Sequence, residues 1–161
     1  MFRSMIAAIT LIANSGTALA QADEQSDLTV IHAGHLLAIP GQAAVANRSI
    51  LIRDGRIEAI QSGFVTPDGA HIIDLSDQFV LPGLIDSHVH LQGELSPDGR
   101  LREVTENSAD LALNGVRNAR TTLLAGFTTV QDVGGDLEAS TGLRNAIRDG
   151  DVIGPRMRVS G

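Results

Sequence analysis

The segment FVLPGLIDSHVHLQ, residues 79–92, decides the prediction of the fold. Its apolar run is interrupted by a Pro-Gly pair, restarts before Asp86 and ends with His88 and His90. Side chains alternate along a β-strand, so a strand here places Asp86, His88 and His90 on one face. Two neutral imidazoles that project together from a stiff strand suit a zinc-type ion at about 2.0–2.1 Å. Taken alone, this spacing is a weak signal of a metal site, because two histidines two residues apart also occur by chance on exposed strands.

Two later segments complete a set of three motifs. They read AGFTTVQDVGG at residues 125–135 and GPRMRVSG at residues 154–161. The three motifs, in this order, resemble the amidohydrolase superfamily, and within it the imidazolonepropionase-like and dipeptidase-like branch. The resemblance covers residues 28–161 and implies that the motifs form, or lead into, the first three strands of a barrel. One position departs from it, because Gln131 precedes Asp132 where the family usually has arginine.

The resemblance implies an α/β fold, an incomplete TIM-type (β/α)8 barrel preceded by a small antiparallel β domain. A complete barrel takes about 250 residues, and one strand–helix unit about 30. Because only 81 residues run from Leu81 to Gly161, residues 81–161 are expected to hold the first two to three units. Residues 28–80 are expected to form the N-terminal part of a β-sandwich domain. Within them, Asp54-Gly55 between two apolar-patterned runs predicts a two-residue hairpin.

Local patterns predict the individual elements. Strands are expected at residues 29–33, 36–39, 49–53, 56–61, 71–74, 128–132 and 156–160, and helices at residues 108–125 and 141–148. Asn107 or Ser108 is suited to cap the first helix. Residues 91–102 are expected to be a polar loop, which is either a wall of the pocket or a plain surface turn.

Residues 1–20 have the form of a signal peptide. Arg3 precedes an apolar core at residues 5–13, and Ala18-Leu19-Ala20 forms a small-residue cleavage site. A hydrocarbon layer needs about 20 apolar residues, so this core is too short to span a membrane, and no later segment is apolar enough. We therefore expect export, to a bacterial periplasm or the medium, with residues 21–27 as a polar leader.

Composition narrows the classes of partner. The chain has 12 basic and 19 acidic residues, a formal net charge of −7, and no Cys, Trp or Tyr. Disulfides are thereby excluded within the chain. An acidic chain without stacking rings is also a poor binder of nucleic acid. The expected partner is a small-molecule or dipeptide substrate, and the sequence leaves the oligomeric state open.

The resemblance also implies a chemistry, the hydrolysis of an amide, peptide or cyclic-amide C–N bond by a divalent metal. Zinc is the expected ion, in one or two copies, with His88 and His90 as its first ligands. Asp86 either orients an imidazole N–H or is a carboxylate that backbone donors satisfy. Asp132, at the end of the second motif, is expected to support the site in a similar way.

The residues that would complete such a site are expected beyond Gly161. In the family these include a bridging lysine on the fourth strand and a proton-transferring aspartate on the eighth, and this chain contains no lysine. Two alternatives stay open. One is a deaminase of the same superfamily, which the presence or absence of that lysine separates from the hydrolase. The other is a truncated, non-catalytic chain.

Overall fold

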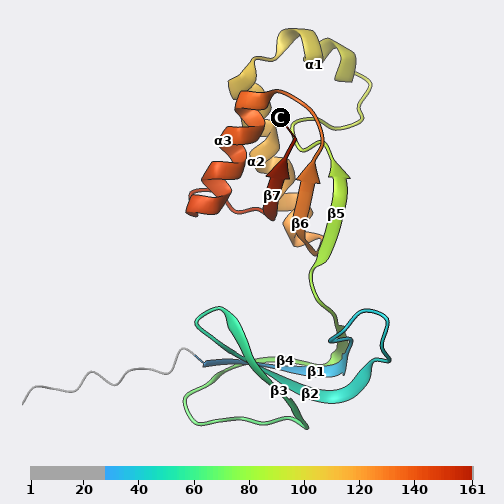
Figure 1. Ribbon diagram of the computed structural model, residues 1–161, viewed down its shortest axis with the longest axis vertical. Helices are drawn as coiled ribbons and strands as arrows, with labels where there is room; N and C mark the ends of the chain where they lie inside the picture. Colours follow the sequence, from blue (N-terminus) through green and yellow to red (C-terminus); the bar gives the residue numbers. More distant parts are fainter. Residues whose placement is uncertain (1–27, 161) are drawn as a thin grey trace, which may run out of the picture.

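The computed structural model describes residues 28–160 and places them in two sheets with three helices (Figure 1). The predicted signal peptide, residues 1–20, and the predicted leader, residues 21–27, lie outside the described residues. Among the described helices, none is long and apolar enough to cross a membrane.

The first sheet contains four strands in the order β3-β2-β1-β4. Their bounds are β1 Leu28–Leu36, β2 Val45–Arg53, β3 Arg56–Ser62 and β4 His71–Val80. The pairs β1–β2 and β2–β3 are antiparallel, whereas β4 is parallel to β1. The prediction of a purely antiparallel domain is therefore wrong for β4. Residues 63–70 carry the chain back across the sheet, so that β4 starts beside the beginning of β1, with His71 opposite Thr29.

The predicted hairpin joins β2 to β3. Asp54 and Gly55 have φ values of 50° and 70°, which is the pair of left-handed residues that a type I′ turn requires. The strand predicted at residues 29–33 lies within the longer strand β1, whereas of the strand predicted at residues 36–39 only Leu36 belongs to β1 and residues 37–39 lie outside any strand. The pairing of β1 with β4 is irregular between Ala33 and His35. Glycine is required inside this irregularity because a Cβ on Gly34 would overlap the carbonyl oxygen of Ser76.

The second sheet contains three parallel strands in the order β5-β6-β7. Their bounds are β5 Leu84–Val89, β6 Phe127–Asp132 and β7 Arg156–Val159, and the helices are α1 Gly99–Thr105, α2 Ser108–Leu124 and α3 Leu137–Asp149. Parallel strands that alternate with helices agree with the beginning of the predicted α/β fold. The described residues contain three such strands.

One hydrophobic cluster fixes α2 and α3 against this sheet. Leu91 follows β5, Ala119 lies on α2, Val130 on β6, Leu143 on α3 and Met157 on β7, and all five are buried. Both helices therefore cover the same face. The three strands point in one direction, and α1 lies beyond their carboxyl ends (Figure 1).

The ends of the helices follow their capping residues. Asn107 caps α2 in a reciprocal capping box with Asp110, as one of the two predicted caps. Helix α3 starts at residue 137, earlier than the predicted 141, because Asp136 caps it through an Oδ1 that accepts from the N–H of Ala139 at 2.8 Å. The predicted loop at residues 91–102 is loop only as far as residue 98, and α1 begins at Gly99.

Candidate functional site

His88 and His90 lie at the carboxyl end of β5. His88 is the residue before the last of the strand, and His90 is the first residue after it. Their ring centroids are 5.4 Å apart and the ring planes make an angle of 75°. Both side chains are exposed. The two imidazoles therefore lie side by side at the end of the sheet where β6 and β7 also finish.

A hydrogen bond fixes the tautomer of His90. Its Nδ1 lies 2.9 Å from the backbone oxygen of Gly134, in the loop after β6. A carbonyl oxygen only accepts, so Nδ1 must carry the proton. In the neutral ring this leaves Nε2 with a free lone pair, which is the arrangement that metal-binding histidines adopt.

Asp86 acts on the backbone of the histidine segment. Its Oδ1 accepts the N–H of His88 at 3.0 Å, and the side chain is half-buried. The pairing of β5 with β6 is irregular between Asp86 and Val89, so the regular alternation assumed from the sequence does not run through these residues. The structure thus gives Asp86 a backbone donor, and its predicted role at a metal site stays a prediction.

Asp132 ends β6 and is almost completely buried, with 1% of its surface exposed. Its Oδ2 accepts the N–H of Leu91 at 3.1 Å, and its Oδ1 accepts the N–H of Gly134 at 3.2 Å. Both donors are backbone groups, so this carboxylate has hydrogen-bond partners without a cationic residue at position 131.

Sequence reasoning missed Gln92, which is 5% exposed. Its Oε1 accepts the N–H of Asp136 at 2.7 Å, and its Nε2 donates to the backbone oxygen of Asp136 at 2.7 Å and to Ser140 Oγ. This amide joins the loop after β5 to the start of α3. The only signal in the sequence was a polar residue directly after a buried apolar one, which is common at strand ends.

The donor set fits part of a metal site. Two imidazoles supply two of the four positions of a tetrahedral zinc shell. Within residues 28–160 no group of three or more His, Cys, Asp or Glu side chains is arranged to hold a metal. The described residues can therefore supply a pair of nitrogen ligands, and the remaining positions need other donors.

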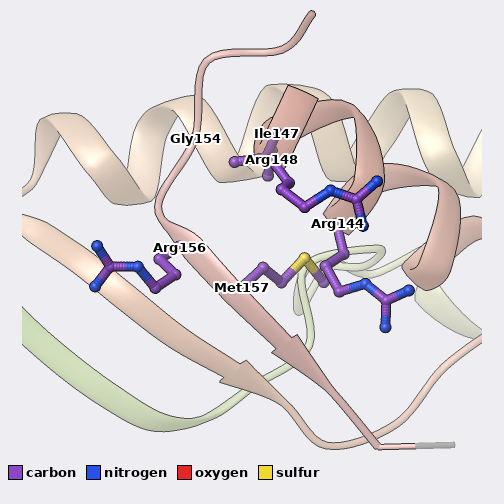
Figure 2. Close-up of a pocket in the computed structure, with 6 residues that line it drawn as sticks. All are labelled: Arg144, Ile147, Arg148, Gly154, Arg156 and Met157. Carbon is purple, nitrogen blue, oxygen red and sulfur yellow. The ribbon is translucent and has the colours of Figure 1, made fainter. Parts of the chain in front are cut away.

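Two grooves flank the second sheet. One, of about 390 Å³, runs between β5 and α2 and is lined by residues that include Asp86, His90 and Asn118. The other, of about 520 Å³, lies between α3 and β7 and contains Arg144, Arg148 and Arg156 (Figure 2). In Figure 2 the guanidinium group of Arg156 points away from those of Arg144 and Arg148, and Arg148 is paired with Asp149. Of these two grooves, the first is the one that His90 lines.

Fold and site together define an α/β protein in which parallel strands alternate with helices. A pair of histidines lies at the carboxyl end of the first of these strands. Residues 79–161, just over half of the sequence, match the model of the amidohydrolase family. The chain belongs to this family.

Several relatives carry names of hydrolases. A dihydroorotase of Halalkalibacterium halodurans is 34% identical over 102 residues, which are 63% of this chain and 20% of the relative. A dihydroorotase of Citrifermentans bemidjiense is 45% identical over 53 residues, which are 33% of this chain and 12% of the relative.

Solved structures of hydrolases are also similar to this chain. A Xaa-Pro dipeptidase with bound methionine is 34% identical, with a TM-score of 0.75 over 83% of this chain and 33% of that one. Molinate hydrolase is 26% identical, with a TM-score of 0.72 over 85% of this chain and 30% of that one. The chain thus spans a third or less of the length of these relatives.

Proposed function

We propose that this chain supplies the first two ligands of a divalent-metal centre in a hydrolase that acts on C–N bonds. The observation that carries the proposal is the 2.9 Å hydrogen bond from His90 Nδ1 to the Gly134 carbonyl, which leaves Nε2 free beside the ring of His88. Family membership supports the reaction class, and dihydroorotases and a Xaa-Pro dipeptidase are among the relatives.

The residues of this chain have separate roles in the proposed centre. His88 and His90 would hold the ion, and Asp86 and Asp132 would fix the backbone from which the rings project. A bound divalent ion supplies a water of lowered pKa, about 7 for zinc, and polarises the carbonyl of the substrate. The substrate class follows as a small amide, dipeptide or cyclic amide, which the groove beside His90 would admit from the side of α2.

Two imidazoles are half of a four-coordinate shell, so we further propose that the 161-residue chain binds zinc but does not hydrolyse C–N bonds by itself. Metal-dependent turnover of a dipeptide or a cyclic amide by the purified chain would contradict this. The deaminase alternative gains no support from the relatives named above.

The metal proposal is tested by zinc titration of the chain against a chromophoric chelator. His88→Ala and His90→Ala should each lower the zinc affinity at least about tenfold, because each removes one of two nitrogen ligands. His71→Ala is the matched control, since His71 is an exposed histidine on β4 in the first sheet. Equal zinc affinity of all three variants and the parent chain would refute the assignment.

A further inference from the structure

We propose that Asp132 is a positioning residue for His90, and that it acts through two backbone amides without touching either imidazole. The inference rests on the proposed metal-binding role of His90. It assigns to Asp132 a role that its burial alone does not require, namely to set which nitrogen of His90 faces the metal.

The two carboxylate oxygens of Asp132 accept backbone N–H groups on both sides of the His90 ring. Oδ2 accepts the N–H of Leu91, the residue that follows His90, at 3.1 Å. Oδ1 accepts the N–H of Gly134 at 3.2 Å, and the carbonyl of the same Gly134 receives Nδ1–H of His90 at 2.9 Å. Asp132 therefore fixes both the main chain that carries the ring and the residue that orients it.

The loop after β6 needs such an anchor because its first residue, Val133, is followed by two glycines. Gly134 has no side chain to pack, and Gly135 has a φ of 149°, a conformation that other residues rarely adopt. The direction of the Gly134 carbonyl thus depends on the bonds made by its neighbours in the main chain. Asp132 supplies one on the amino side, and Gln92 holds the N–H of Asp136 on the carboxyl side.

The geometry also explains why a carboxylate is suited to this position. Both oxygens of a carboxylate accept, whereas an asparagine amide has one acceptor and one donating NH₂ group. In Asp132→Asn, either Leu91 or Gly134 would present its N–H to another donor. One of the two contacts must then open, although the size of the side chain is unchanged.

The test uses the 161-residue chain labelled with ¹⁵N-histidine, near pH 8, where an ordinary imidazole is neutral. In the parent chain, ¹⁵N NMR should show His90 as the Nδ1–H tautomer, and hydrogen exchange should be slow at the amides of Leu91 and Gly134. In Asp132→Asn, both tautomers of His90 should appear, and the zinc affinity should fall about 10- to 100-fold. Asp74→Asn is the control, because the Oδ1 of Asp74 accepts a backbone N–H from Ser76 in the first sheet.

The outcomes separate this inference from the metal proposal. If His90 of the parent chain is mainly the Nε2–H tautomer, or if the Leu91 and Gly134 amides exchange freely, the inference is overturned without any variant. It is equally overturned if folded Asp132→Asn keeps the tautomer and zinc affinity of the parent chain. If the parent chain shows the Nδ1–H tautomer but binds no zinc, and Asp132→Asn loses that tautomer, the metal proposal fails while the positioning role stands.

Discussion

Replacement of Gln92 by alanine tests whether a single buried amide holds the loop after β5 to the start of α3. The side chain makes three hydrogen bonds, two to the backbone of Asp136 and one to Ser140 Oγ. Alanine removes all three hydrogen bonds, and Ser140, one of the partners, is only 4% exposed. Each net hydrogen bond contributes about 1 kcal/mol, and a buried group left unpaired costs about 1–3 kcal/mol. Because water reaches half-buried Asp136, we expect a total loss of about 2–4 kcal/mol.

The loss is measured by urea unfolding followed by circular dichroism at the helical band. All helices of the described residues lie in the second part of the chain, so this signal reports on the unit that contains Gln92. With an m-value of about 2 kcal/mol/M, the midpoint should fall by about 1–2 M. Gln61→Ala, at an exposed position of β3, is the control and should leave it unchanged. If the two variants unfold at the same urea concentration, the amide does not stabilise the loops as argued.

Two further predictions concern other parts of the chain. Gly83→Ala should lower the free energy of unfolding by about 1–3 kcal/mol, because the new Cβ would overlap the Thr128 side chain. Thr128→Ala in the same chain should restore part of the urea midpoint. Additive effects of the two changes would contradict the contact. Hydrogen bonds from the side chain and backbone of Ser76 hold the pKa of Asp74 below 3.8. The ionised Asp74 therefore contributes its full stabilisation of the folded chain above pH 3.8, and this contribution is lost as the pH falls through the lowered pKa. Carboxyl NMR of Ser76→Ala should show that pKa rising towards 3.8, and an unchanged pKa would refute the assignment.

Short-range patterns predicted the parts of the fold that depend on local chemistry. The Asp54-Gly55 turn follows from two residues that tolerate positive φ, and the cap at Asn107 follows from a side chain that can accept backbone N–H groups. Apart from helix α1, which was not predicted, the order of strands and helices after residue 84 also agrees with the prediction, because these elements have their own apolar periods.

Pairings between residues far apart in the chain could not be predicted from the sequence. The strand period of β4 is the same whether its neighbour runs parallel or antiparallel, so the pairing with β1 depends on how residues 63–70 cross the sheet. The partners of Asp132 lie in loops after two different strands, and its contact with Leu91 spans 41 positions. The metal-binding role of His88 and His90 stays a prediction, although the structure brings the two rings together.

The geometry of the histidine pair therefore depends on β6 as much as on β5. In the second sheet β5 has a single neighbour, and its pairing is irregular between Asp86 and Val89, so ladder hydrogen bonds hold the segment before His90 only in part. Side chains hold the remaining backbone groups, since Asp86 binds the N–H of His88 and Asp132 binds that of Leu91. Because Asp132 ends β6, a change that disturbs this strand should displace the ring of His90 even where β5 is intact. We therefore expect the two histidines to reach the geometry proposed for a ligand pair only when the next strand–helix unit has folded against β5.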